Sequence, residues 1–243
     1  MKIIKPIVKI VDPMSPEEMI RKLNRSARKC YQSEPKGPDE NLVRNIIKSG
    51  HTSVLEHASF TLDIITDRGV LAELTRHRMA GYSVESTRYC NYDGKEITFI
   101  EPITIKNNEK LYDLWRNQCL TSEMAYKQMR NAGAEPQEAR QVLNNSLKCE
   151  IRMTVNIRSL RNVFSLRCAK GAHPHIKQLF IPLLLWMQDK YGVLFEDITY
   201  DQDFAKKYLT DWKNYCTIDT DGESMSIDDK TVSFKRIELS EDH

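Results

Sequence analysis

The densest group of polar side chains in this 243-residue sequence lies between residues 75 and 92, TRHRMAGYSVESTRYCNY. Arg76, His77 and Arg78 are consecutive, and Ser86 and Arg88 follow them closely. An arginine can hold a phosphate through two parallel hydrogen bonds, and hydroxyl and loop N–H groups can complete an oxyanion site. The segment therefore predicts an anionic ligand, with a nucleotide as the first candidate and a solvated basic surface as the alternative.

Other kinds of chemistry have less support in the sequence. Ser86 could act as a nucleophile, but no neighbouring motif supplies the base that would activate it. His51 and His57 flank Glu56, but their spacing is not that of HExxH and no further ligand completes a shell. We therefore predict no metal site. The sequence contains no GxGxxG, which argues against a Rossmann-type cofactor domain.

The elements expected around these residues mix helices and strands. Hydrophobic spacing and breakers predict helices over about 16–30, 40–49, 70–78, 107–131, 136–147, 159–169, 174–191 and 201–213, and strands over 3–11, 58–66 and 149–157. Ser15 and Glu18 are typical of a capping box, and Pro182 predicts a kink or a later start of its helix. Residues 80–95 are expected to form a functional loop. Helices dominate, so the predicted fold class is α+β.

Composition limits the class of protein. With 40% hydrophobic and 29% charged residues, the chain reads as an ordinary globular protein. No uncharged run is as long as a membrane span, and charged residues interrupt the opening MKIIKPIVKIVD, so integral membrane and secreted proteins are disfavoured. The six cysteines include no CxxC pair, and we interpret them as free thiols in a reducing cytosol. A cytoplasmic location is expected.

The formal net charge of +2 hides an uneven distribution. Residues 216–243 contain eight acidic and three basic residues, a charge of −5, so residues 1–215 carry +7. A moderately basic body suits nucleotide phosphates or nucleic acid. Uneven surface charge without any ligand explains the same numbers.

Four ordered segments resemble the flavin-dependent thymidylate synthase family. Residues 50–64, GHTSVLEHASFTLDI, resemble its GHxSxxEH segment, and residues 76–89, RHRMAGYSVESTRY, resemble its signature of RHR, seven residues, then serine and Arg-Tyr. Arg140 stands where the family places an arginine, and residues 154–167, TVNIRSLRNVFSLR, resemble its NxRSL segment. The resemblance covers about residues 27–191. It implies one synthase domain over 1–215 and leaves 216–243 as an acidic C-terminal extension without an assigned role. The charge of this extension and its single short apolar stretch, from Val232 to Leu239, predict a late strand or a mobile segment.

The resemblance implies a reaction and its participants. Family members make dTMP from dUMP, with 5,10-methylenetetrahydrofolate as the one-carbon donor and FAD reduced by NAD(P)H, and they use no cysteine nucleophile. The expected partners are thus dUMP, the folate and NADPH, and neither nucleic acid nor a membrane. The expected architecture is mixed helices around a small antiparallel sheet, in a homotetramer whose active sites lie between subunits.

The resemblance also implies roles for individual residues. Arg167 corresponds to the arginine that favours the ionised form of the uracil ring at N3, because a guanidinium stays protonated and stabilises negative charge. The implied dUMP contacts are Glu73, Arg76, Val84, Ser86, Arg88, Arg140 and Arg167. The implied FAD contacts are Ser53, Arg76, His77, Arg78, Asn156, Arg158 and Asn162, with His51 in the flavin and folate pocket. For either asparagine, a helix cap is the alternative.

The chain departs from the family pattern at Val84, His173 and His175, among other positions. Val84 lacks the polar side chain of many members, although its backbone N–H could still serve a phosphate. His173 and His175 stand where the family often has glutamine and glutamate, and they suggest a helix start or at most a folate contact.

Two other functions stay open from the sequence. Tyr82, Tyr89 and Tyr92 near Arg88 would suit stacking on single-stranded nucleic acid, although the acidic tail and the lack of an RNA-module motif weigh against it. A flavin- and nucleotide-binding protein without synthase activity is the second alternative.

Overall fold

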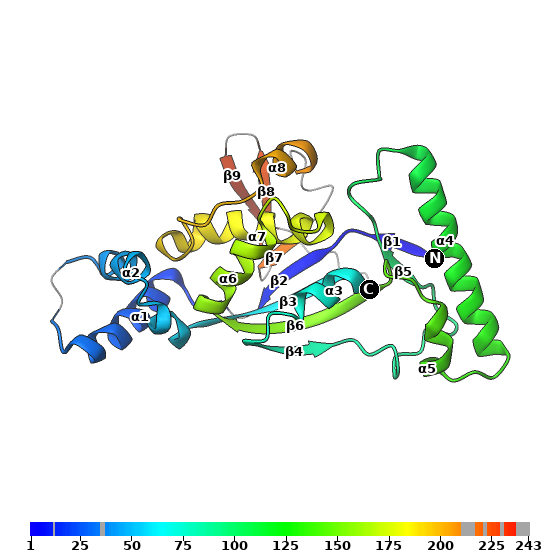
Figure 1. The fold of residues 1–243 in the computed structure, drawn as a ribbon, viewed down its shortest axis with the longest axis horizontal. Coiled ribbons are helices and arrows are strands. Elements are labelled where there is room, and N and C mark those ends of the chain that lie inside the picture. Colours follow the sequence, from blue (N-terminus) through cyan, green and yellow to red (C-terminus); the bar gives the residue numbers. More distant parts are fainter. Residues whose placement is uncertain (12, 35–36, 210–216, 221–222, 229–230, 237–243) are drawn as a thin grey trace.

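The computed structural model describes residues 1–11, 13–34, 37–209, 217–220, 223–228 and 231–236. A seven-stranded sheet of order β4-β6-β3-β2-β7-β8-β9 lies at its centre (Figure 1). The strands are β2 (Ile7–Val11), β3 (Ser59–Asp67), β4 (Ala80–Val84), β6 (Lys148–Asn156), β7 (Thr217–Thr220), β8 (Glu223–Asp228) and β9 (Thr231–Arg236). The four strands from β4 to β2 are antiparallel, and β7 pairs with β2 in parallel. The predicted α+β class is confirmed.

The two central strands, β3 and β6, have one apolar face and one open face, because successive side chains of a strand point to opposite sides. Their buried residues are Phe60, Leu62, Ile64, Ile151, Met153 and Val155. On the open face, the register places Asp63 opposite Arg152 and Thr61 opposite Thr154. The first pair forms a 2.6 Å ion pair and the second a 3.0 Å hydrogen bond.

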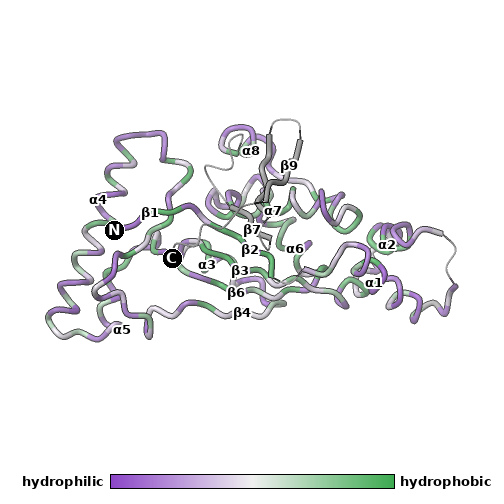
Figure 2. Tube along the Cα trace, turned by 180° about the vertical axis from the view of Figure 1, so that it is seen from behind, coloured by the Kyte–Doolittle hydropathy of each residue, from purple (hydrophilic) through white to green (hydrophobic). Residues whose placement is uncertain are grey.

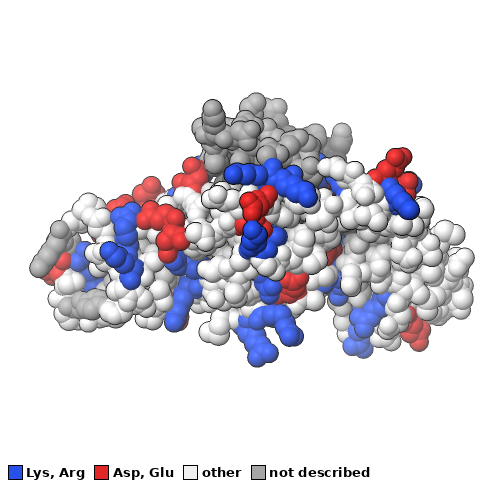
Figure 3. Space-filling view, turned by 45° about the horizontal axis from the view of Figure 1, so that its top comes forward, with Lys and Arg blue, Asp and Glu red and all other residues white. Residues whose placement is uncertain are grey.

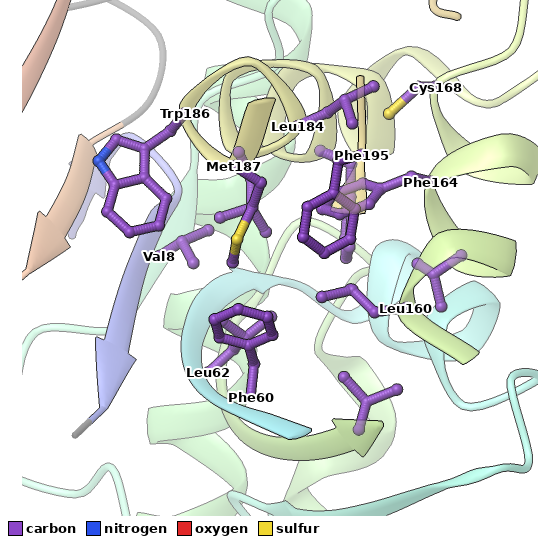
Figure 4. Packing of buried hydrophobic residues seen from close by; sticks show 14 of the residues in the cluster. Val8, Phe60, Leu62, Leu160, Phe164, Cys168, Leu184, Trp186, Met187 and Phe195 are labelled. Carbon is purple, nitrogen blue, oxygen red and sulfur yellow. The ribbon is translucent and has the colours of Figure 1, made fainter. Parts of the chain in front are cut away.

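Helices α3 (Arg68–Leu74), α6 (Ile157–Arg167) and α7 (Pro174–Tyr191) contribute to the core on the apolar face. Figure 4 shows Phe164 of α6 beside Phe195, above Phe60 of β3. The rings of Phe164 and Phe195 meet edge to face, with centroids 5.6 Å apart. Burying such a ring contributes about 1.5–3 kcal/mol. The core therefore fixes α6, which carries several predicted site residues, against the sheet.

Further helices extend the molecule at both ends (Figure 1). At one end lie α1 (Pro16–Tyr31) and α2 (Asp39–Lys48), joined to β3 by the 3₁₀ helix η1 (Thr52–His57). At the other lie α4 (Glu109–Asn131), α5 (Pro136–Ala139) and the 3₁₀ turn η2 (Arg140–Val142), near the parallel pair β1 (Lys2–Ile4) and β5 (Thr98–Ile100). The 3₁₀ turn η3 (Gly192–Leu194) and α8 (Gln202–Tyr208) follow α7. Figure 2 shows hydrophobic strands β2 and β3 between more hydrophilic outer helices.

Several predicted elements are confirmed to within a few residues. Helix α1 begins with the predicted capping box, in which the N–H of Glu18 donates to Ser15 Oγ and the N–H of Ser15 to the Glu18 carboxylate. Helix α4 and strands β3 and β6 agree with their predictions closely. These are the segments with the longest regular hydrophobic spacing or the clearest cap.

Other predictions are wrong. The strand over 3–11 is two strands, β1 and β2, separated at Pro6, which has no N–H for a ladder. Residues 80–84 of the expected loop form strand β4, and the helix over 136–147 ends at Ala139. Helix α7 spans Pro174–Tyr191, as predicted, and continues through Pro182, so only the alternative of a later start is wrong. Helix α8 ends at Tyr208, and residues 210–213 lie outside the described part of the chain.

The acidic extension was expected to form a late strand or a mobile segment. Its described residues form β7, β8 and β9, which continue the sheet beyond β2. The predicted apolar stretch from Val232 to Leu239 includes part of β9, and residues 237–243 lie outside the described chain.

None of the helices in the described ranges is long and apolar enough to cross a membrane. On the face drawn in Figure 3, basic and acidic side chains are interspersed among uncharged ones.

Candidate functional site

The predicted site residues fall into three clusters. The Arg167 cluster, between α3 and the end of α6, contains Glu73, His77 and Arg167. The Ser86 cluster, after β4 and beside α5, contains Ser86, Arg88 and Arg140. The Asn156 cluster, at the start of α6 beside η1, contains Ser53, Asn156 and Arg158. The other predicted side chains are exposed or half-buried on the segments between them, namely His51, Arg76, Arg78, Val84 and Asn162.

Three hydrogen bonds hold the guanidinium group of Arg167. Its Nη1 donates to Glu73 Oε2 at 2.7 Å and its Nη2 to the Glu73 carbonyl oxygen at 2.9 Å. Its Nε donates to His77 Nε2 at 2.9 Å. The side chain is 19% exposed, so the ion pair with Glu73 is partly shielded from water. The bonds orient the cation and use three of its five N–H groups, which leaves two for a ligand.

Tyr82, a residue that the sequence analysis did not assign to the site, supports this cluster. Its hydroxyl lies 2.8 Å from the carbonyl oxygen of Leu74 and 3.0 Å from that of His77, so it donates to the end of α3. Burial raises the pKa of Tyr82 to about 12, which keeps the donor proton at neutral pH. The pairing of β4 with β6 places Tyr82 beneath α3, and no local pattern shows this.

His77 is held in its neutral form. Burial lowers the pKa of its imidazole, and the positive charge of Arg167 lowers it further. Nε2 therefore carries a lone pair that accepts from Arg167, and the ring proton is on Nδ1. Protonation of His77 would remove this acceptor and place a second cation beside Arg167.

We expect the protonation of His77 to destabilise the folded protein in weak acid. Because the folded pKa lies below the unfolded value of about 6.5, the unfolded chain takes up the proton first. The stabilising contribution of neutral His77 to the free energy of unfolding is complete above about pH 6.5. It is lost as the pH falls toward the folded pKa of His77. Urea unfolding at several pH values should show a smaller loss in His77→Gln, whose amide oxygen can accept from Arg167 but cannot titrate. Equal losses in both proteins would contradict the assignment.

The Ser86 cluster is built on a tight turn. The backbone N–H groups of Tyr89 and Cys90 donate to the carbonyl oxygen of Ser86 at 3.2 and 2.8 Å. The N–H of Arg88 lies 3.3 Å from Ser86 Oγ. This hydroxyl thus meets a backbone donor and not a base, in agreement with the weak support for a nucleophilic serine.

The two arginines of this cluster have partners that the sequence analysis did not identify. Arg88 Nε donates to Gln137 Oε1 of α5 at 3.0 Å, and Arg140 Nη1 donates to Thr87 Oγ1 at 3.3 Å. Gln137 follows the helix-starting Pro136, and Thr87 lies inside the motif, but only the packed structure brings the two segments together. Gln137 of the short helix α5 therefore orients Arg88, and Thr87 in the turn after β4 orients Arg140.

The backbone of Val84 points toward the open edge of the sheet. β4 is an edge strand, and the N–H of Glu85 donates to the carbonyl oxygen of Glu150 at 2.8 Å. Because ladder bonds alternate along an antiparallel strand, the N–H of Val84 points away from β6. This orientation is compatible with the expected role of the Val84 amide, which stays a prediction.

In the Asn156 cluster, the helix cap considered for the asparagines applies to one of them. Asn156 Oδ1 accepts from the N–H of Ser159 at 2.8 Å and begins α6, whereas Asn162 lies exposed along the helix. Arg158 forms a 2.6 Å ion pair with Glu56, and both side chains are about half exposed. An exposed ion pair of this kind is weak, so Arg158 can release Glu56 and bind another anion instead.

The three clusters do not converge within one chain. The five residues of β4 span about 17 Å between the Arg167 and Ser86 clusters, at about 3.4 Å per residue. The eleven residues of α6 span about 16 Å between the Asn156 and Arg167 clusters, at 1.5 Å per residue. A single chain thus keeps the three groups of predicted site residues apart.

His173 and His175, the two histidines that differ from the family pattern, lie at the start of α7. His173 Nδ1 accepts from the N–H of His175, as a helix start predicts. His175 Nδ1 lies 2.8 Å from Asp67 Oδ2, and Asp67 is buried, with its other oxygen accepting from the N–H of Val70. The sequence analysis missed this pair, which joins the starts of α3 and α7.

The cysteines that the structure describes are free. Burial raises the pKa of Cys149 to about 12 and also raises that of Cys168, so the reactive thiolate is disfavoured at both. Cys216 lies outside the described residues. Among those residues, no group of three or more His, Cys, Asp and Glu side chains is arranged to hold a metal ion.

Sequence comparison connects the chain with known proteins. A family described as thymidylate synthase complementing protein matches residues 9–191. The chain is 32% identical over 184 residues to the flavin-dependent thymidylate synthase of Geobacter sulfurreducens, covering 71% of this chain and 78% of that protein. It is 34% identical over 143 residues to the flavin-dependent thymidylate synthase of Pyrococcus furiosus, covering 58% of this chain and 59% of the relative. The match thus spans less than two thirds of the Pyrococcus protein.

Structural comparison shows a similar fold in a crystal structure of a UMP/dUMP methylase, PolB from Streptomyces cacaoi, bound with 5-Br dUMP. The TM-score is 0.70 at 20% identity, over 86% of this chain and 98% of the other. The same methylase bound with 5-Br UMP gives a TM-score of 0.67. At this identity, the likeness supports the α+β arrangement of the chain.

Proposed function

The chain belongs to the family of flavin-dependent thymidylate synthases, and from this membership we propose that it methylates dUMP reductively to dTMP. The observation that carries the proposal is the Arg167 cluster, in which Glu73 and His77 orient a cation beside the RHR segment. A cation oriented before the substrate arrives stabilises developing negative charge without reorganising during the reaction.

The proposed role of Arg167 is to stabilise negative charge on the uracil ring. The guanidinium stays protonated, and its ion pair with Glu73 is partly buried, so its charge acts with less screening than in water. Ser86, Arg88 and Arg140 would bind the phosphate, through a hydroxyl and two cations already oriented by Gln137 and Thr87. Glu73 would act mainly through Arg167, because its carboxylate and carbonyl oxygens are both bonded to that side chain.

The chemical nature of the donors fits FAD. Arg76 and Arg78 are exposed and Arg158 is half exposed, and three guanidinium groups suit a pyrophosphate. Ser53 and Asn162 are exposed hydrogen-bonding side chains for the ribose or adenine. When bound, FAD would carry reducing equivalents from NADPH to the one-carbon unit delivered by 5,10-methylenetetrahydrofolate. His51, exposed at the start of η1, would lie at the flavin and folate pocket.

We also propose the homotetramer with shared sites that the family resemblance implies. The separation of the three clusters in one chain supports this, because a second chain could bring its own Asn156 or Ser86 cluster to the Arg167 cluster. The predicted cytoplasmic location and the assignment of residues 1–215 as the synthase domain stay predictions.

A labelled substrate tests the proposed reaction. The purified protein should be yellow from bound FAD and should release tritium from C5-labelled dUMP when 5,10-methylenetetrahydrofolate and NADPH are present. Omission of the folate is the control. A colourless protein that binds single-stranded nucleic acid would favour the alternative of a nucleic-acid-binding protein. A yellow protein that binds dUMP but releases no tritium would indicate a flavin- and nucleotide-binding protein without synthase activity.

Replacement of Ser86 by alanine should weaken dUMP binding more than it slows turnover. Loss of one hydrogen bond to a charged phosphate costs about 1.5–3 kcal/mol, which is roughly a tenfold or greater rise in the dissociation constant. Binding and single-turnover measurements separate the two effects. Abolished turnover with unchanged dUMP affinity would instead indicate a nucleophilic serine.

A further inference from the structure

A buried histidine–aspartate pair joins α7 to the junction between β3 and α3. His175 Nδ1 lies 2.8 Å from Asp67 Oδ2, and the side chains of His175 and Asp67 are 20% and 4% exposed. Because a carboxylate accepts hydrogen bonds and does not donate them, Nδ1 carries a proton and donates to Asp67. Neither residue belongs to the Arg167, Ser86 or Asn156 cluster.

Asp67 bonds both helices at once. It is the last residue of β3, where the register pairs it with Lys148 of β6. Its Oδ1 accepts from the N–H of Val70 at 2.8 Å and thus caps the start of α3. Gly69 allows this close approach, because a Cβ at that position would lie 3.1 Å from Oδ1. One carboxylate oxygen therefore holds the first turn of α3, and the other holds His175 of α7.

The core holds these two helices to different degrees. Helix α7 is buried along most of its length, whereas the buried residues of α3 are Val70 and Leu74. A helix of seven residues is too short to be stable by itself, so its course depends on tertiary contacts. Helix α7 is therefore the rigid support, and α3 is the element that the polar contacts at its ends must orient.

The far end of α3 holds the guanidinium group of Arg167. Glu73, in the last turn of α3, accepts from it with a carboxylate and a carbonyl oxygen, and His77, just beyond the helix, accepts with Nε2. The seven residues of α3 span about 10 Å, at 1.5 Å per residue. A change in the direction of the helix at Asp67 thus moves the acceptors of Arg167 at its other end.

We propose that His175 is a positioning residue for Arg167. It orients the carboxylate of Asp67, which sets the direction of α3 and with it the places of the Glu73 and His77 acceptors. The inference rests on the proposed function and gives a role in it to a pair outside the three clusters. Misplacement of a reacting or charge-stabilising group by about 1 Å can lower a rate about a hundredfold, so a remote contact of this kind affects turnover.

The pair depends on a departure of this chain from the family pattern. The family often has glutamate at position 175, where a second carboxylate would face that of Asp67. Two carboxylates so close together repel each other, whereas the imidazole N–H of His175 gives Asp67 a donor. The motif comparison alone therefore does not assign this role to His175.

Variants of the full-length protein test the role. His175→Leu removes the donor, and His175→Asn keeps one, because the amide nitrogen of asparagine stands at the same place in the side chain as Nδ1. Gln188→Leu is the matched control on the same helix, because Gln188 donates to the carbonyl oxygens of Phe195 and Ile198 at 3.1 and 2.9 Å. Tritium release per bound flavin measures turnover, calorimetry measures dUMP binding, and urea unfolding measures stability.

The expected result separates positioning from stability. His175→Leu should lower turnover about ten- to a hundredfold, with FAD retained and a smaller loss of dUMP affinity. His175→Asn should recover most of the turnover. Gln188→Leu should lower the midpoint of urea unfolding, as His175→Leu does, but keep its turnover per bound flavin.

A double-mutant cycle shows whether the effect passes through Arg167. His175→Leu should cause no further loss of turnover in the Arg167→Ala protein, whereas independent effects would multiply. In urea unfolding, the double variant should lose less stability than the sum of the two single losses, because the two contacts hold the same short helix.

Three results would overturn the inference. They are unchanged turnover in folded His175→Leu, an equal loss in His175→Leu and His175→Asn, and independent effects of His175→Leu and Arg167→Ala in the cycle. If His175→Leu does not fold, as judged by circular dichroism, His175→Ala takes its place with a smaller side chain. If the unaltered protein releases no tritium, the proposed function fails, and the unfolding cycle decides whether His175 positions Arg167.

Discussion

Replacement of Arg167 by alanine is expected to lower the turnover of dUMP by about a hundred- to a thousandfold, the usual effect of removing a group that stabilises charge in a transition state. FAD should be retained, because the proposed FAD contacts do not include Arg167. The variant also leaves Glu73 without its ion pair and His77 without its donor. Tritium release per mole of bound flavin measures the effect independently of the amount of folded protein.

Two further variants separate charge from orientation at this position. Arg167→Lys keeps the positive charge but cannot reproduce the bonds to both Glu73 and His77, so an intermediate loss is expected. Arg161→Ala is the matched control on the same helix, because Arg161 is also partly buried and forms an ion pair, with Asp197. Its turnover per folded molecule should be retained. Full turnover in Arg167→Ala would show that the guanidinium has no part in the reaction.

Replacement of Phe164 by alanine is expected to lower the free energy of unfolding by about 3–5 kcal/mol, the range for an aromatic residue truncated in a core. The ring is fully buried and meets both Phe180 and Phe195. Its loss leaves a cavity between α6, α7 and the turn after α7. Because α6 carries Asn156 at one end and Arg167 at the other, dUMP and FAD affinity should fall as well.

The same helix supplies the control for this prediction. Leu166 is 54% exposed, so Leu166→Ala should change the free energy of unfolding by no more than about 0.5 kcal/mol. Urea unfolding of the three proteins measures both effects. A similar loss in both variants would indicate that α6 is stabilised by something other than the aromatic contacts of its buried face.

Local signals in the sequence were sufficient for several elements. The capping box of α1 needs only residues 15–18, and the alternation in β3 and β6 is a property of each strand. Strand β4 lies in a segment that was predicted as a loop because residues 80–95 contain Gly81, Gly94, tyrosines and serines, and its pairing with β6 is a contact that no local pattern shows. Helix α5 ends after four residues and is followed by η2, where Arg140 donates to Thr87, a contact that the sequence pattern does not show.

For the site, the sequence was sufficient to determine the chemical types and the family, through the order of the RHR, Ser86-x-Arg88 and NxRSL segments. The tertiary structure decided which groups the side chains of these segments contact. Glu73 and Arg167, which form an ion pair, are 94 positions apart in the sequence. A motif records spacing along the chain, which sets local conformation. The direction of a guanidinium, the acceptor it meets and the state of a histidine beside it depend on groups that only packing brings within hydrogen-bond distance.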